Sequence, residues 1–198
     1  MFVTLEGLDG SGKTTQASLL RDLLEAEGAE VVVTREPGGT ELGEAVRDLL
    51  LHGGHVAPWA EAALYAASRA QHVEQVIGPA LERGAVVICD RYVDSSVAYQ
   101  GIARGLGLER VLELNLAAVG GLMPDRTFLL EIAVADAARR VGDERDRIER
   151  EDDGFRERVA AAYAELAARF QERYVVVDAS RPPEEIAQEI HGALRRRP

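Results

Sequence analysis

Cysteine is nearly absent from the chain, and long apolar runs are missing. Cys89 is the only cysteine among 198 residues, so no disulfide can form within the sequence. No apolar run approaches the roughly 20 residues that a membrane-spanning helix needs. The N-terminus opens on Phe2-Val3-Thr4-Leu5, without the basic region, apolar stretch and cleavage site of a targeting peptide. We therefore expect a protein of the reducing cytoplasm, with no segment removed before folding.

Positive charge is in deficit, and lysine is almost missing. The formal net charge is -11 at pH 7, so most of the surface would repel a nucleic-acid polymer or an anionic membrane, and we expect neither as a partner. Any anion must then bind at a local positive pocket. Of the 23 lysine and arginine residues, only Lys13 is a lysine. A slim ammonium group fits a tight loop better than the broad arginine fork, although a general preference for arginine could also have left one lysine by chance.

Short apolar runs rich in β-branched residues alternate with longer helical stretches, which is typical of a parallel sheet covered by helices on both faces. The sequence predicts strands at 2–5, 30–34, 85–89, 127–132 and 174–178. It predicts helices at 13–27, 41–51, 58–75, 79–83, 108–120, 134–141, 153–173 and 182–195. Neither an internal repeat nor a linker-like change of composition interrupts the pattern, so we expect residues 1–198 to form one α/β domain.

A phosphate-binding loop follows the first predicted strand. Gly7-Leu8-Asp9-Gly10-Ser11-Gly12-Lys13-Thr14 matches the pattern G-x-x-x-x-G-K-[ST], and a helix is predicted to begin where this loop ends. Glycine lets backbone N–H groups approach phosphates closely, and the helix N-terminus adds roughly half a positive charge. A glycine-rich turn without function is the alternative, but it would not require this strand, loop and helix order.

The loop predicts a three-layer fold of the P-loop NTPase type, with a five-stranded parallel sheet. Lys13 would neutralise the β- and γ-phosphates of ATP. The predicted ATP-binding residues are Gly7, Leu8, Asp9, Gly10, Ser11, Gly12, Lys13, Thr14 and Thr15.

A magnesium site is predicted beside this loop. Thr14 supplies a hydroxyl, and the apolar run 86–89 ends in Asp90, at the strand end where ligands bind in open α/β sheets. We expect Thr14 and Asp90 to ligate the Mg²⁺ that accompanies ATP, although Asp90 could also be an ordinary strand-end or cap residue. Cys89 is interpreted as a small buried apolar side chain rather than as a nucleophile.

Four motifs in a fixed order resemble one family. They are the P-loop, the run Thr34-Arg35-Glu36-Pro37-Gly38-Gly39-Thr40, the pair Tyr65 and Arg69, and Asp90-Arg91-Tyr92 followed by Ser95, Ser96, Tyr99, Gln100 and Gly101. Together they resemble the thymidylate kinases, in particular the bacterial form, over nearly the whole chain. The resemblance implies transfer of the γ-phosphoryl group of Mg·ATP to dTMP, giving dTDP and ADP for dTTP biosynthesis. It also implies a homodimer packed through helices.

The resemblance further assigns the acceptor side of the site. Tyr65 and Arg69 share a helix face, and the family assigns them to stacking on thymine and to its carbonyl edge; without the family they would be interpreted as a surface or partly buried pair. Arg91 would grip the acceptor phosphate with help from Arg35, because a planar fork matches phosphate oxygens. Tyr99 would pack where a 2′-hydroxyl would otherwise lie. The predicted pocket also includes Asp9, Ser96 and Gln100.

One arginine is still needed near the transferred phosphoryl group, and this P-loop contains none. Residues 139–158 carry dense charge of both signs with few apolar anchors, so we expect a mobile flap at about 139–150. The run 145–149 resembles the flap motif of the family. Arg140, Arg145 and Arg147 are all candidates, of which Arg147 is favoured. The predicted catalytic residues are therefore Lys13, Asp90, Arg91 and Arg147.

Two other functions stay open at this point. A kinase for another nucleoside monophosphate or for a deoxynucleoside would share the P-loop, but Tyr65, Arg69 and Tyr99 argue against it. A nucleotide-binding switch would retain ATP or GTP tightly and turn over slowly without an acceptor.

Overall fold

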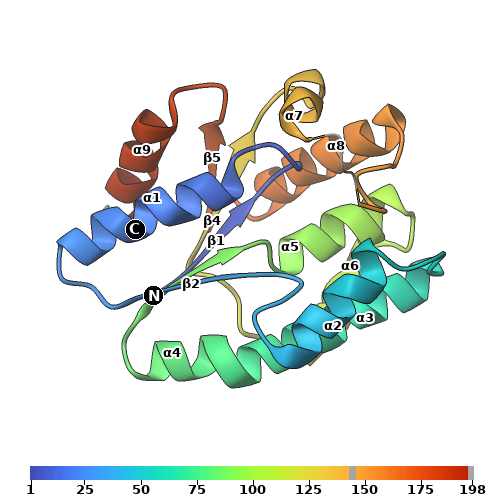
Figure 1. The fold of residues 1–198 in the computed structure, drawn as a ribbon, viewed down its shortest axis with the longest axis horizontal. Coiled ribbons are helices and arrows are strands. Elements are labelled where there is room, and N and C mark those ends of the chain that lie inside the picture. The colour runs from blue at the N-terminus through green and yellow to red at the C-terminus, as the bar shows by residue number, and fades with distance from the viewer. Residues whose placement is uncertain (143–145, 196–198) are drawn as a thin grey trace.

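Five parallel strands form the centre of the molecule in the computed structural model, which describes residues 1–142 and 146–195 (Figure 1). Their order across the sheet is β2-β3-β1-β4-β5. The strands are β1 (Phe2–Glu6), β2 (Val31–Arg35), β3 (Val86–Asp90), β4 (Arg126–Glu131) and β5 (Tyr174–Asp178). The five predicted strands are confirmed, with ends that shift by a residue.

Helices cover both faces of this sheet (Figure 1). Helices α1 and α9 pack together on one face, while α5, α6 and α8 lie on the other. The helical elements are α1 (Lys13–Ala26), α2 (Glu41–Leu51), α3 (Pro58–His72), the π-helix η1 (Val73–Ile77), α4 (Gly78–Glu82), α5 (Val93–Ser96), the π-helix η2 (Val97–Ala103), α6 (Leu108–Ala118), α7 (Val134–Arg140), α8 (Asp153–Arg169) and α9 (Pro183–Arg195). The predicted three-layer α/β fold of the P-loop type is confirmed.

Burial of the sheet explains why the strands are continuous apolar runs in the sequence. All five residues of central strand β1 are buried, because helices cover both of its faces. The edge strands β2 and β5 are less covered, and Val33 and Val176 are 41% and 47% exposed. In the register of the sheet, Asp90 lies opposite both Leu5 and Arg35. The carboxyl ends of β1, β2 and β3 therefore meet at one edge, where the chain turns into its functional loops.

The segment 93–103 is the main departure from the predicted elements. It had no predicted helix, yet α5 and η2 run through it, and Val93, Val97 and Ala98 are almost fully buried. Serine, glycine and β-branched residues give this segment weak helix propensity, and tertiary packing outweighs it.

Two predicted helix ends were also wrong. Helix α8 ends at Arg169 rather than at residue 173, because the chain turns there: the N–H groups of Arg173 and Tyr174 both donate to the Phe170 carbonyl. The helix predicted at 58–75 instead passes from α3 through η1 into α4. Among the helices of the two described segments, none combines the length and apolar composition needed to cross a bilayer.

Candidate active site

The P-loop connects β1 to α1 along a path that two glycines make possible. Gly12 caps α1 with φ 93°, in the left-handed region that side chains rarely adopt. Gly10 has φ 83°, and a Cβ there would clash with the carbonyl oxygen of Ala137 on α7. The loop therefore folds tightly beneath α7, and its residues line a cavity of about 600 Å³.

Lys13 lies in this loop with its side chain folded back. Its Nζ donates to the carbonyl oxygens of Gly7 (3.2 Å) and Leu8 (2.8 Å), and the residue is 6% exposed. Burial, and secondly the charge of Arg91, lower the pKa of Lys13 to about 8. Eight consecutive residues of the P-loop and the start of α1, from Asp9 to Gln16, line the cavity, whereas the predicted residues Gly7 and Leu8 do not.

The two predicted magnesium ligands lie next to each other. The Thr14 hydroxyl donates to Asp90 Oδ2 at 2.8 Å, and both residues line the same cavity. They come from α1 and from the end of β3, so the sheet register brings them together. A hydroxyl and a carboxylate are hard oxygen donors, which is the donor type that Mg²⁺ prefers.

Asp9 and Arg91 stand where this cavity meets a second pocket, since both residues line both spaces. Arg91 Nη2 donates to Asp9 Oδ1 at 2.5 Å, and the Tyr99 hydroxyl donates to Asp9 Oδ2 at 3.3 Å. Burial acts to raise the pKa of Asp9, but Arg91 and Lys13 outweigh it and lower the pKa to about 2. The Asp9 carboxylate is therefore ionised at neutral pH.

The backbone of Arg91 is also unusual. Its φ of 69° is in the left-handed region, the one such case at a non-glycine residue of the described chain. Its N–H donates to the Leu5 carbonyl at 3.0 Å, which ties the turn after β3 to β1. Such conformations cost free energy and concentrate at functional sites.

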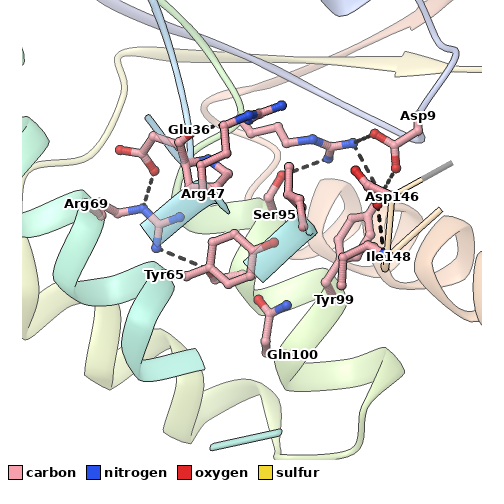
Figure 2. Close-up of a pocket in the computed structure, with 14 residues that line it drawn as sticks. Asp9, Glu36, Arg47, Tyr65, Arg69, Ser95, Tyr99, Gln100, Asp146 and Ile148 are labelled. Carbon is pink, nitrogen blue, oxygen red and sulfur yellow. Dashed lines mark hydrogen bonds and ion pairs between the residues drawn. The ribbon is translucent and has the colours of Figure 1, made fainter. Parts of the chain in front are cut away.

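The second pocket gathers the predicted acceptor residues (Figure 2). Asp9 and Tyr99 lie on one side of it and Arg69 with Glu36 on the other (Figure 2). The predicted residues that line it are Asp9, Tyr65, Arg69, Arg91, Ser96, Tyr99 and Gln100. The sequence did not predict its further lining residues Glu36, Pro37, Arg47, Leu51, Ser95, Asp146 and Ile148.

Arg69 is held rigidly at the base of this pocket. It is 1% exposed, and Nε donates to Glu36 Oε2 at 2.6 Å. The other acceptors are Ser96 Oγ (3.1 Å), the Tyr92 carbonyl (3.0 Å) and Asn115 Oδ1. These contacts use four of the five N–H groups of a guanidinium, which leaves one N–H on Nη2.

Glu36 is in turn held by a histidine. Its Oε1 is 2.9 Å from His72 Nδ1, and His72 Nε2 is 2.6 Å from the Thr34 hydroxyl. Glu36, His72 and Cys89 could geometrically offer three metal-ligand atoms. The first two are occupied by each other and by Arg69, and the Cys89 thiol donates to the Arg91 carbonyl. We therefore interpret the cluster as a hydrogen-bonded support for Arg69.

The remaining predicted arginines lie outside the acceptor pocket. Arg35 lines the P-loop cavity, and its Nη2 donates to both carboxylate oxygens of Glu44. Arg147, the favoured flap arginine, donates to the Leu50 carbonyl (2.7 Å) and to Glu61 (2.6 Å), and lines neither space. Arg140 does line the P-loop cavity and donates to the Ala179 carbonyl at 3.2 Å. The third candidate, Arg145, lies outside the described residues.

Several site residues had little signal in the sequence. Arg181, Pro183 and Ile186 line the P-loop cavity from the far end of the chain, and no local motif marks them. Tyr163 of α8 contacts Arg91 across 72 positions. A polar residue at the end of an apolar strand, Glu6, was the one visible hint of the buried cluster around Arg91.

A P-loop that opens onto a second, arginine-rich and aromatic pocket defines a kinase for a small phosphate-bearing acceptor. The family model described as thymidylate kinase matches residues 5–190, and the chain belongs to the thymidylate kinase family. The resemblance inferred from the motifs is thereby confirmed, and the chain is a nucleoside monophosphate kinase with ATP as its phosphoryl donor.

Individual relatives agree with this assignment. The thymidylate kinase of Clavibacter michiganensis subsp. michiganensis is 57% identical over 194 residues, covering 96% of this chain and 92% of that protein. The thymidylate kinase of Leifsonia xyli subsp. xyli is 56% identical over 198 residues, covering 98% and 94%. The crystal structure of thymidylate kinase from Ehrlichia chaffeensis has a TM-score of 0.83 at 32% identity, covering 99% of this chain and 98% of that chain.

Lys13 offers a direct test of the P-loop, because the sequence holds no other lysine. We expect an amine-reactive reagent at about pH 7.5 to label Lys13 and the N-terminus, since a pKa of about 8 leaves part of the amine neutral. Saturating ATP should protect Lys13 and leave N-terminal labelling unchanged, as measured by peptide mass mapping. The Lys13→Arg variant is the control and should carry the N-terminal label alone. Equal labelling of Lys13 with and without ATP would contradict the assignment.

Proposed function

We propose that the two connected spaces bind ATP and dTMP, and that the γ-phosphoryl group passes directly between them to give ADP and dTDP. The observation that carries this proposal is the position of Asp9 and Arg91, which line both spaces. A phosphoryl group moving from the P-loop to an acceptor phosphate has to cross this junction. In-line transfer of this kind asks for positioning and charge rather than for a covalent intermediate.

The donor side is proposed to bind the ATP phosphates along the P-loop. Lys13 would exchange its two carbonyl contacts for the β- and γ-phosphates, which are stronger, charged acceptors. Arg181, Pro183 and Ile186 line the other end of the cavity, where we place the donor nucleoside. Thr14 and Asp90 would hold Mg²⁺, which supplies charge neutralisation on the phosphates when bound.

The acceptor side is proposed to recognise thymine and deoxyribose. Tyr65 would stack on the base, and the remaining N–H of Arg69 Nη2 would donate to a base carbonyl. Tyr99 would pack against the sugar where a 2′-hydroxyl would lie, because Asp9 and Arg91 hold its hydroxyl in place. Ser96 and Gln100 would complete the pocket. Arg91 would bind the acceptor phosphate, and Arg35, which lies on the P-loop side, would assist from there.

We also propose that residues 1–198 act as one P-loop kinase domain with a flap at about 139–150 that excludes water during transfer. The cytoplasmic location expected from the sequence stays a prediction.

Acceptor specificity is the most direct test of the proposed substrate. With Mg·ATP, we expect dTMP to be used with a kcat/KM at least about a hundredfold above AMP, CMP or UMP, because a pocket with fixed hydrogen-bonding groups rejects mismatched bases strongly. Coupled measurement of ADP release gives these values. ADP release without any acceptor should be close to zero. Equal use of dTMP and AMP would refute the specificity, and acceptor-independent slow turnover with tight nucleotide retention would favour a switch.

The flap arginine can be identified with two variants. Arg147 was favoured from the sequence and stays a prediction, but Arg140 lines the P-loop cavity whereas Arg147 is paired with Glu61. We therefore expect Arg140→Ala to lower kcat by about a hundredfold or more, with little change in the KM for ATP, because an arginine finger acts on the transition state. Steady-state kinetics with Arg147→Ala as the matched variant decides between them. If only Arg147→Ala lowers kcat, Arg147 is the arginine finger. If neither variant lowers kcat, neither residue is the arginine finger.

The proposed homodimer is supported by exposed apolar side chains on α2 and α3. Leu42, Leu49 and Trp59 are 46%, 57% and 40% exposed, and α2, α3 and α6 pack side by side. We expect Leu49→Glu to weaken or abolish dimerisation, because it buries a charge in an apolar contact. The control is Val176→Glu, which changes another exposed apolar residue, on edge strand β5. Sedimentation velocity measures both. A wild-type chain that sediments as a 21.5 kDa monomer would refute the dimer.

A further inference from the structure

Glu6 is a fully buried carboxyl group that is not among the proposed donor or acceptor residues. It ends β1, directly before the P-loop, and is 0% exposed. Its Oε1 accepts from the Tyr92 backbone N–H at 2.8 Å. Its Oε2 is 2.6 Å from the Ser95 hydroxyl and 2.9 Å from the Tyr163 hydroxyl. Burying a carboxyl group costs free energy. This cost favours a role for Glu6 in the site around it.

Glu6 Oε2 and the hydroxyl oxygens of Ser95 and Tyr163 form a closed ring of three oxygens. The Ser95 and Tyr163 hydroxyls are 2.9 Å from each other, so each oxygen lies within hydrogen-bond distance of the other two. Filling three such contacts takes three protons, and the two hydroxyls supply only two. A carboxyl proton on Glu6 supplies the third. With that proton, each oxygen donates once and accepts once around the ring.

The ring faces the guanidinium of Arg91. Arg91 Nη1 donates to Ser95 Oγ at 3.1 Å and to Tyr163 Oη at 3.2 Å. Each hydroxyl oxygen keeps one acceptor site for this purpose when the ring is complete. The other terminal nitrogen, Nη2, is bound by Asp9 and Tyr99. Both ends of the fork are therefore fixed, one by the ring and the other by the P-loop.

Charge at Glu6 has consequences for Arg91. Burial, and secondly the charge of Asp94, raise the pKa of Glu6 to about 7, although Ser95, Arg91 and Tyr163 act to lower it. The other titratable groups that interact with Glu6 are Lys13 on α1, Cys89 on β3, Arg173 after α8 and Tyr174 on β5. An ionised Glu6 would place a second carboxylate beside Arg91, in addition to Asp9. That charge would reduce the attraction of Arg91 for a phosphate.

We infer that Glu6 is a positioning residue: in its neutral form it closes the ring with Ser95 and Tyr163 that orients Arg91 toward the acceptor phosphate without neutralising it. This inference rests on the proposed role of Arg91. The alternative is a carboxyl group that merely supports the turn at Tyr92, and such a group would affect stability but not the binding of dTMP.

The variant Glu6→Gln tests the inference, because an amide cannot both donate and accept at one atom and therefore opens the ring. At about pH 6 we expect the KM for dTMP to rise about tenfold, the effect of losing one or two ordering hydrogen bonds. The KM for ATP should change less than about twofold, since the inferred effect acts through Arg91 on the acceptor alone. Thr4→Val is the matched control: Thr4 is also fully buried on β1 and hydrogen-bonds Thr127, away from Arg91.

The pH dependence separates positioning from structural support. In the wild-type enzyme, ionisation of Glu6 above about pH 7 opens the ring, so its KM for dTMP should rise with pH. The ratio of the variant's KM to the wild-type KM should therefore fall from about tenfold at pH 6 to about one or below at about pH 8.5, where only the wild type carries the extra negative charge near Arg91. Ionisation of the dTMP phosphate is common to both enzymes and cancels in this ratio. The Thr4→Val ratio should stay near one at every pH.

Each outcome has a definite meaning. A Glu6→Gln enzyme with an unchanged KM for dTMP at pH 6, or with a pH-independent ratio, overturns the inference. If Glu6→Gln does not fold, Tyr163→Phe replaces it: this change removes one ring oxygen and one Arg91 acceptor, and should raise the KM for dTMP about threefold or more. No rise in that variant also overturns the inference. Failure of the proposed function would look different, because wild type would not phosphorylate dTMP, or Arg91→Ala would leave the KM for dTMP unchanged.

Discussion

The ion pair between Asp9 and Arg91 is the contact on which the rest of the site depends. It joins the P-loop to the turn after β3, so the space for the donor phosphates and the space for the acceptor share one wall. Each partner is held by further groups: Asp9 by Tyr99, and Arg91 by Ser95 and Tyr163. The pair is only partly buried, but it is held by several hydrogen bonds, so removal of one partner would leave the other without its opposite charge.

The parallel sheet explains why residues so distant in sequence can form this contact. Strands β1, β2 and β3 are neighbours and end at the same edge. Each therefore delivers its following loop to one place: the P-loop, the turn containing Glu36, and the turn containing Arg91. The acceptor pocket is completed by helices α3 and η2, which lie on the side of the sheet away from α1. The strand order thus brings together loops and helices that are far apart in the sequence.

Much of the fold and the donor site could be predicted from the sequence, because their signals are local. The alternation of apolar runs and helical stretches identified all five strands, and the P-loop pattern placed Lys13 and Thr14 before any contact was visible. Asp90 was predicted because a carboxylate follows an apolar strand, and its side chain does lie beside Thr14. The resemblance to thymidylate kinases supplied Tyr65, Arg69, Tyr99 and Gln100, which do meet in one pocket.

The remainder depended on contacts between distant segments. Helix α5 and the π-helix η2 form where propensity is weak, since burial against α6 and α8 supports them. The contact between Glu6 and Tyr163 spans 157 positions, and although Glu6 stands out at the end of an apolar strand, no sequence pattern pairs it with Tyr163. The sequence could not show which of Arg140 and Arg147 faces the P-loop, because that depends on the direction of each side chain. The Arg147 side chain donates to Glu61, whereas Arg140 lines the P-loop cavity.

The close approach of Gly10 to α7 limits how the enzyme can change over evolutionary time. Gly10, the second glycine of the loop, would ordinarily be explained by the phosphates that the loop binds. Here the backbone of Gly10 presses against the Ala137 carbonyl, one turn before Arg140. Any side chain at Gly10 would displace α7, even if the phosphates could accommodate it. The P-loop and α7 must therefore vary together, and a substitution in one of them can survive only if the other makes room.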